Sequence, residues 1–238
     1  LKWGLAQSNN WISAWLMNQL SPAALVRLIH EFGVENRDIH PSLALCLGPC
    51  DISVAEMVGA YTAFARKGVR RCPLYVTRIE DSNGDVVAEF QPRVREVISE
   101  QAACKMVTLM RGVIDSGTGR RMRFRYNLTA PMAGKTGTTN DNSDGWFVGY
   151  TPSLSFGAWV GGEERDIHFS SMAIGQGANA ALPIAAYFLK KVYADSSLGY
   201  TQNEDFDIPE GFDPCGQDDG SEEEVQSGEP AVLDELAN

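Results

Sequence analysis

Three short strand-like segments follow one another in the second half of the chain, and they constrain its fold more than any other feature. They span residues 131–138, 145–151 and 154–162, and the connections between them, TNDNSD and PS, are short. Such connections join antiparallel neighbours, because a parallel crossover needs roughly a dozen residues or more. The sequence therefore predicts an antiparallel sheet in this part of the chain.

Helical patterns lie before and after these strands. They have apolar residues at helical spacing and a capping residue or a proline near the start, such as Ser53 with Glu56 three positions later. The expected helices cover residues 22–33, 54–67, 100–115 and 182–193. An Asn83-Gly84 pair adds a predicted β-hairpin within residues 73–90. The predicted fold class is α+β, an antiparallel sheet covered by helices.

Charge divides the chain into two parts. Residues 195–238 hold 14 of the 31 acidic side chains and no Lys or Arg, which leaves 17 acidic and 20 basic side chains in residues 1–194. A segment so rich in charge and so poor in apolar surface does not offset the entropy lost on folding. We therefore expect one folded unit in residues 1–194 and an acidic, disordered tail in residues 195–238. The charge pattern does not suggest a nucleic-acid partner.

The stretch Lys135-Thr136-Gly137-Thr138 ends the first predicted strand. On an edge strand an ammonium group attracts a carboxylate, and hydroxyl groups donate hydrogen bonds to it. A glycine lets a substrate backbone come close and pair as an added strand. This edge is suited to the C-terminus of a peptide, although the four residues alone also fit an ordinary strand.

A second polar stretch, Ser8-Asn9-Asn10, lies between two helix-like segments. Taken alone, it is most simply a cap for the helix that starts near Trp11. The order of the motifs favours a functional role over a cap alone: Ser-x-Asn comes first, then Lys-Thr-Gly-Thr, then two aromatic-rich strands and a covering helix.

This arrangement resembles the transpeptidase domain of penicillin-binding proteins, specifically the bifunctional class A group that makes peptidoglycan. Further stretches are similar to class A proteins: DISVAEMVGAYTAFARKGVRRCPLYVTRIEDSNGDVV, KTGTTNDNSDGWFVGYTPSLSFGAWVGGE and GQGANAALPIAAYFLKKVY. The resemblance covers about residues 1–194. It implies the transpeptidase fold that penicillin-binding proteins share with serine β-lactamases.

The resemblance also implies roles for residues of both motifs. Ser8 would relay a proton to the leaving group, and Asn10 would bind a substrate carbonyl. Lys135, Thr136 and Thr138 would hold and neutralise the substrate carboxylate, and Gly137 would allow the close approach of the substrate. The implied partners are peptidoglycan stem peptides that end in D-Ala-D-Ala and β-lactam antibiotics, and the implied reaction is acyl transfer from a serine to an amine of a neighbouring stem peptide.

The Ser-x-x-Lys nucleophile of this family is missing, since no serine in the sequence has a lysine three positions later. In this family the nucleophile precedes the Ser-x-Asn element. We therefore expect residues 1–194 to be the C-terminal two-thirds of a transpeptidase domain whose N-terminal portion is absent, and we expect this chain alone to be inactive. An upstream part of the same protein would supply the nucleophile, the first sheet strands, a glycosyltransferase domain and a membrane anchor on the periplasmic side.

Two other interpretations stay open. A serine β-lactamase or D,D-carboxypeptidase shares the motifs and the fold, and a non-catalytic module could sense cell-wall peptides or β-lactams. No cofactor is expected. A metal site is not expected either, because a zinc site needs about four well-placed ligands and the chain offers five cysteines and three histidines without such spacing.

Overall fold

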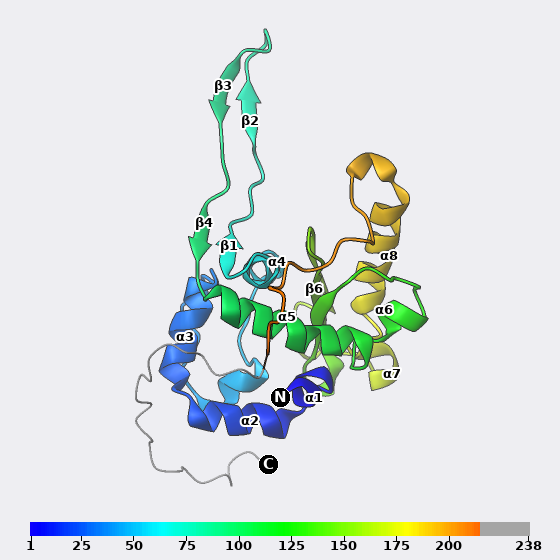
Figure 1. Ribbon diagram of the computed structural model, residues 1–238. Helices are drawn as coiled ribbons and strands as arrows, with labels where there is room; N and C mark the ends of the chain where they lie inside the picture. Colours follow the sequence, from blue (N-terminus) through cyan, green and yellow to red (C-terminus); the bar gives the residue numbers. More distant parts are fainter. Residues whose placement is uncertain (215–238) are drawn as a thin grey trace.

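The computed structural model describes residues 1–214 as a body of helices around a sheet, with one hairpin that projects from it (Figure 1). The helices are α1 (Lys2–Ala6), α2 (Asn10–Gln19), α3 (Pro22–Glu31), α4 (Val54–Ala65), α5 (Glu100–Asp115), α6 (Arg121–Phe124), α7 (Met172–Gly175) and α8 (Leu182–Ala194). The 3₁₀ helices are η1 (Leu43–Leu47), η2 (Asn140–Asn142) and η3 (Ser196–Leu198). The strands are β1 (Val69–Arg71), β2 (Arg78–Glu80), β3 (Val86–Glu89), β4 (Val94–Glu96), β5 (Ala133–Thr138), β6 (Asp144–Tyr150) and β7 (Ser155–Gly161).

The central sheet contains the three strands predicted between residues 131 and 162. Its order is β5-β6-β7, and both pairs are antiparallel. Lys135 in β5 lies opposite Val148 in β6, and Trp146 in β6 lies opposite Trp159 in β7. The predicted antiparallel sheet is therefore confirmed, and β5, which carries the Lys-Thr-Gly-Thr stretch, is an end strand of this sheet.

Helices cover both faces of the sheet, which explains why β6 reads as a nearly continuous apolar run. On one face Phe147 packs in a cluster with Leu189 of α8. On the other face Tyr150 packs in a cluster with Met110 of α5 and with Tyr61 of α4. Successive residues of a strand point to opposite faces, so the two aromatic side chains of β6 anchor different layers. Both are fully buried. The predicted α+β class, a sheet covered by helices, is confirmed.

Three of the predicted helices begin at their predicted caps. Ser53 and Glu56 form a capping box, in which each side chain accepts a hydrogen bond from the backbone N–H of the other residue. The Ser21 and Ser99 hydroxyls accept hydrogen bonds from the third residue after each of them. Such caps satisfy N–H groups that have no partner inside the helix and contribute about 1 kcal/mol each.

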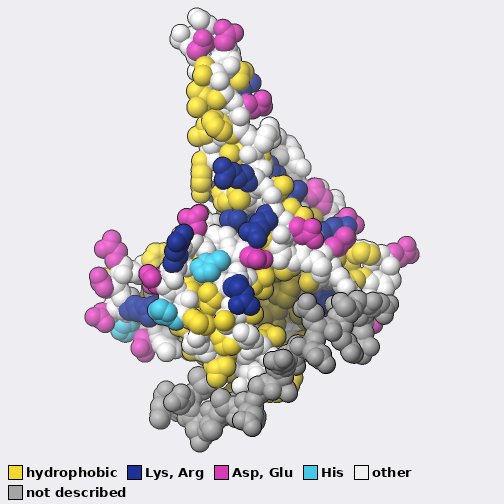
Figure 2. Space-filling view, turned by 90° about the vertical axis from the view of Figure 1, so that its left-hand side faces the viewer, with side chains coloured by type: hydrophobic (Ala, Val, Ile, Leu, Met, Phe, Trp, Pro, Cys, Tyr) yellow, Lys and Arg dark blue, Asp and Glu magenta, His cyan; other side chains and the backbone are white. Residues whose placement is uncertain are grey.

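The predicted hairpin is the outer part of a long arm, residues 69–96. The arm is built from the pair β2–β3 at its outer end and the pair β1–β4 at its base. Gly84 in the outer turn has a φ of +89°, a conformation that suits glycine. Figure 2 shows apolar side chains exposed along one side of the arm. Tyr75, which lies in the arm, is 82% exposed.

Residues 195–214, the first part of the predicted acidic tail, have contacts with the body of the molecule. Phe206 is 9% exposed and its ring centroid lies 5.7 Å from that of Tyr150 in β6. Asp205 Oδ1 lies 3.3 Å from the Arg111 guanidinium of α5. The average composition of the acidic segment predicts disorder and does not show that one aromatic side chain, Phe206, packs against the body. The rest of the predicted tail, residues 215–238, lies outside the described residues.

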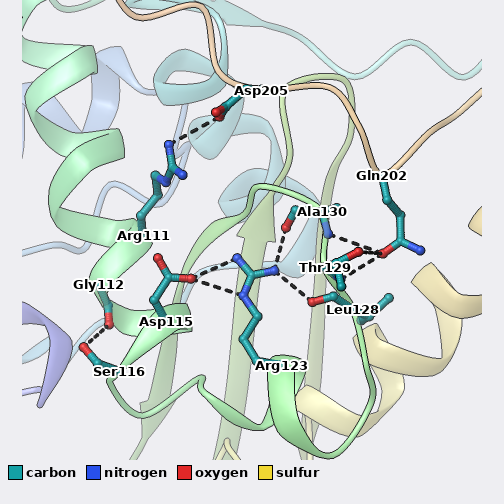
Figure 3. A network of polar contacts seen from close by, with 10 residues as sticks. All are labelled: Arg111, Gly112, Asp115, Ser116, Arg123, Leu128, Thr129, Ala130, Gln202 and Asp205. Carbon is teal, nitrogen blue, oxygen red and sulfur yellow. Dashed lines mark hydrogen bonds and ion pairs between the residues drawn. The ribbon is translucent and has the colours of Figure 1, made fainter.

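Polar contacts fix the chain just before β5 (Figure 3). Arg123 of α6 donates hydrogen bonds to the carbonyl oxygens of Leu128 and Ala130, at 2.8 and 2.7 Å, and pairs with Asp115 of α5 at 2.9 Å. From the other side, Gln202 Oε1 accepts hydrogen bonds from the backbone N–H groups of Thr129 and Ala130. The entry into β5 is thus tied to α5, α6 and the segment that follows α8.

Candidate functional site

The structure brings Ser8 and Lys135 together although they are 127 positions apart in the sequence. Lys135 Nζ lies 2.5 Å from Ser8 Oγ and 2.9 Å from the Thr136 carbonyl oxygen. An ammonium group has hydrogen-bond donors and no acceptor, so Ser8 Oγ accepts in this contact. The Ser8 hydroxyl hydrogen is then available to another partner.

The turn between α1 and α2 places Ser8 for this contact. Ser8 has a φ of +56°, in the left-handed region that costs a residue other than glycine about 1 kcal/mol or more. Asn9, and not Ser8, caps α2, because its Oδ1 accepts a hydrogen bond from the Ile12 backbone N–H at 3.0 Å. Asn10 is the first residue of α2 and its side chain is exposed. The expected contact of Asn10 with a substrate carbonyl stays a prediction.

The side chains of the Lys-Thr-Gly-Thr stretch lie on both faces of β5. Lys135 is opposite Val148 and Thr136 is opposite Phe147, and residues directly opposite each other in an antiparallel pair share a face. Because strand side chains alternate, Thr136 and Thr138 lie on the face away from Lys135. A carboxylate bound at the outer edge of β5 would therefore have the Lys135 ammonium on one face of the strand and the hydroxyls of Thr136 and Thr138 on the other face.

The two threonine hydroxyls have different surroundings. Thr136 is 8% exposed, and its Oγ1 lies 2.6 Å from Thr118 Oγ1. Thr138 is exposed, and its Oγ1 accepts a hydrogen bond from the Gly177 backbone N–H at 3.0 Å. This contact uses an acceptor site of Thr138, so its hydroxyl hydrogen is available to a ligand.

Two glycines allow close packing at this end of β5. A Cβ at Gly177 would lie 2.3 Å from the carbonyl oxygens of both Gly137 and Trp146, so a larger residue there would displace the loop from the sheet. A Cβ at Gly137 would lie 3.0 Å from Trp146 Cβ. Glycine at position 137 therefore allows β5 and β6 to pack closely. This is separate from its expected role, which is to leave room for a substrate.

Burial lowers the pKa of Lys135 from its ordinary value to about 8. Loss of hydration disfavours the charged form of an amine, and a nearby negative charge has the opposite effect. An anion bound at the edge of β5 would therefore raise this pKa again and hold the lysine in its charged form. The site is suited to a ligand that brings its own negative charge.

Sequence reasoning missed two residues of the site, Thr118 and Gly177. Both lie in short stretches rich in glycine, SGTG and GQGA, and the second stretch also belongs to a segment that resembles class A proteins. Within residues 1–214, no group of three or more His, Cys, Asp or Glu side chains is placed to hold a metal ion.

Comparison with known proteins places this geometry in a family. Residues 1–161 match the family described as penicillin binding protein transpeptidase domain. Penicillin-binding protein 1A of Aquifex aeolicus is 32% identical over 209 residues, which are 88% of this chain and 27% of that protein. The chain spans about a quarter of the length of the curated relatives that it matches.

Two solved structures share the fold. Penicillin-binding protein 1A from Haemophilus influenzae superposes with a TM-score of 0.75 at 21% identity, over 82% of this chain and 34% of that chain. The penicillin-binding protein PonA1 from Mycobacterium tuberculosis does so with a TM-score of 0.71 at 26% identity, over 88% of this chain and 58% of that one.

The matched region includes both stretches that meet in the structure, Ser8–Asn10 and Lys135–Thr138. The resemblance inferred from the order of these motifs and the transpeptidase fold that it implied are thereby confirmed. This chain belongs to the penicillin-binding protein transpeptidase family.

Proposed function

We propose that this chain forms the carboxylate-binding part of a D,D-transpeptidase, which cross-links peptidoglycan stem peptides within a bifunctional cell-wall synthase. The observation that carries the proposal is the contact between Lys135 and Ser8 at an end strand of the sheet. Relatives named penicillin-binding protein 1A and 1B support the class A assignment. PonA1, at 26% identity, has been solved in complex with penicillin V, which supports β-lactams as ligands.

In the proposed first step, a serine supplied from upstream of this chain attacks the carbonyl carbon between the two D-Ala residues. A bond forms between the serine oxygen and that carbon, the C–N bond to the terminal D-Ala breaks, and the serine proton passes to the leaving amine. Ser8 suits the relay, because its Oγ accepts from Lys135 and its own hydrogen is free to be donated. In the second step, an amine of another stem peptide displaces the serine and returns a proton to it.

The proposed substrate contacts follow the geometry of β5. The ammonium of Lys135 attracts the terminal carboxylate, Thr136 and Thr138 donate hydrogen bonds to it, and Gly137 leaves room for the peptide backbone. Asn10, exposed beside Ser8, would bind the carbonyl of the acyl group. Such contacts hold the scissile bond in position for attack by the serine.

The proposal is tested by extending the gene upstream to include the whole transpeptidase domain, and by treating this intact domain with a fluorescent penicillin. We expect a covalent label that survives denaturation, and we expect none on the 238-residue chain, which lacks the nucleophile. Rapid hydrolysis of the penicillin would favour a β-lactamase. An intact domain without a Ser-x-x-Lys serine and without a label would favour a sensing module.

Lys135 provides the sharpest site-level prediction. In the intact domain, Lys135→Ala should slow acylation by a carboxylate-bearing β-lactam about 10- to 100-fold, because a charge-assisted contact worth roughly 1.5–3 kcal/mol is lost. Lys190→Ala, on the exposed side of α8, is the control and should acylate at the normal rate. Equal rates for both variants would contradict the role given to Lys135.

The cellular location is also a proposal. No helix within residues 1–214 is long and apolar enough to cross a membrane. We propose that a segment outside this chain anchors the protein, with the transpeptidase domain on the periplasmic side where peptidoglycan is assembled. Protease accessibility of the full-length protein in spheroplasts would test this, and protection from an external protease would contradict it.

A further inference from the structure

The turn Ser116–Gly119 joins the two halves of the site. It follows α5 and lies against the end of α1, where the Thr118 backbone N–H donates a hydrogen bond to the Ala6 carbonyl oxygen at 3.0 Å. Gln7 Nε2 donates to the Ser116 carbonyl oxygen at 3.3 Å. A Cβ at Gly117 would lie 2.2 Å from the Ala6 carbonyl oxygen, so the fit requires glycine. The backbone of this turn therefore contacts Ala6 and Gln7, the two residues that precede Ser8.

The side chain of the same turn reaches β5. Thr118 Oγ1 lies 2.6 Å from Thr136 Oγ1, and either hydroxyl could be the donor. Each hydroxyl has a single hydrogen, so the direction of this bond decides which hydrogen remains for a ligand. If Thr118 donates, the hydrogen of Thr136 is free to bind an acceptor, and the first bond strengthens the second. If Thr136 donates, its hydrogen is not available.

A carboxylate selects between these directions, because an ionised carboxylate only accepts hydrogen bonds. We propose that Thr118 is a positioning residue for carboxylate recognition: its hydroxyl donates to Thr136 Oγ1 and turns the Thr136 hydrogen toward the ligand carboxylate, while its backbone N–H holds the turn on α1 beside Ser8. The inference deepens the proposed function and rests on it for the identity of the ligand, a peptide or β-lactam that bears a carboxylate.

A purely structural role for Thr118 makes a different prediction. In that case, loss of the hydroxyl would lower stability and weaken every ligand to the same extent. In the proposed role, loss of the hydroxyl weakens ligands with a carboxylate and spares matched ligands without one. Serine keeps the hydroxyl and should restore binding, whereas valine keeps the shape of threonine without the hydroxyl.

The test is an NMR titration of the isotope-labelled 238-residue chain with N-acetyl-D-alanyl-D-alanine and with its C-terminal amide, following the backbone amides of residues 136–138. Thr118→Val should weaken binding of the acid about tenfold, as expected for one hydrogen bond to a charged group, and binding of the amide less than twofold. Thr118→Ser should bind the acid within about threefold of the unmodified chain. Thr108→Val is the matched control, since Thr108 Oγ1 donates a hydrogen bond to the Cys104 carbonyl oxygen within α5, and it should change the binding of neither ligand.

Three results would overturn the inference: equal weakening of acid and amide by Thr118→Val, no recovery with Thr118→Ser, or no shift of residues 136–138 by the acid in the unmodified chain. Thermal unfolding of each variant checks that the chain remains folded. The titration does not depend on acylation. If Thr118 controls binding of the acid but the intact domain is not labelled by penicillin, the proposed function fails and this inference stands.

Discussion

Two antiparallel hairpins in this molecule have the same kind of pairing and opposite surroundings. The hairpin β2–β3 forms the outer end of the arm, where Val87 is 67% exposed, and Tyr75, which precedes β2 in the arm, is 82% exposed. The hairpin β5–β6 lies between helices, and Phe147 and Tyr150 on its two faces are fully buried. A two-stranded hairpin alone is at best marginally stable, and packing against further strands and helices makes it rigid enough to hold a site. The candidate site is on the buried hairpin.

Removal of a buried aromatic side chain from β6 should have the largest effect. Phe147→Ala should lower the free energy of unfolding by about 3–5 kcal/mol, because it removes apolar contacts and leaves a cavity. Tyr75→Ala in the arm should change it by less than about 0.5 kcal/mol, as is usual for exposed positions. Urea unfolding followed by circular dichroism measures both. Similar losses for the two variants would show that the arm is packed against another surface in solution.

The segment after α8 stabilises the sheet through one buried aromatic contact, and we expect it to contribute less to the free energy of unfolding than the core of β6. Phe206 contacts Tyr150, and the Arg111 guanidinium lies 5.9 Å from the centroid of the Phe206 ring. Phe206→Ala should lower the free energy of unfolding by about 2 kcal/mol, less than a central core position because this ring lies at the edge of the cluster. Asp205→Ala, which removes an exposed ion pair, should cost less than about 1 kcal/mol. If Asp205→Ala costs as much as Phe206→Ala, the segment is held by charge and not by the buried ring.

The strands and helices of the sheet region could be predicted because their signals are local. The strands appeared within one or two residues of their predicted bounds, and α5 (Glu100–Asp115) begins and ends where its cap and periodicity place it. The contact of Ser8 with Lys135 depends on tertiary packing, and the order of the two motifs could indicate it only through the family resemblance. Local patterns could not show the left-handed φ of Ser8 or the capping role of Asn9, because neighbouring polar residues share the same cap propensity.

Two further features depend on packing between distant segments. The bond between Thr118 and Thr136 joins residues 18 positions apart, and neither side chain type is specific to such a pair. The packing of Phe206 was hidden in an acidic segment whose average composition predicts disorder.

A charged side chain in the covered sheet also differs from one on the exposed surface, because burial changes its pKa. The free energy of unfolding should therefore depend on pH through Lys135. The pKa of Lys135 in the folded chain, about 8, is lower than in the unfolded chain. Between pH 8 and pH 10 the unfolded state therefore binds more protons at this residue than the folded state, and stability rises with pH. Below pH 8 the lysine is charged in both states, and the cost of its burial is present in full.

Lys135→Met isolates this effect. The difference in unfolding free energy between the unmodified chain and Lys135→Met should shift by about 1 kcal/mol in favour of the unmodified chain from pH 7 to pH 10, a value reduced because the lysine is only partly buried. Burial raises the pKa values of Tyr61 and Tyr150, but these groups are present in both proteins, so their contributions largely cancel in the difference. Lys190→Met, on the exposed side of α8, should give a difference that does not change with pH. A flat difference for Lys135→Met as well would mean that water reaches its ammonium as freely as it reaches the surface, and that the sheet does not create the low-dielectric edge on which the proposed carboxylate binding depends.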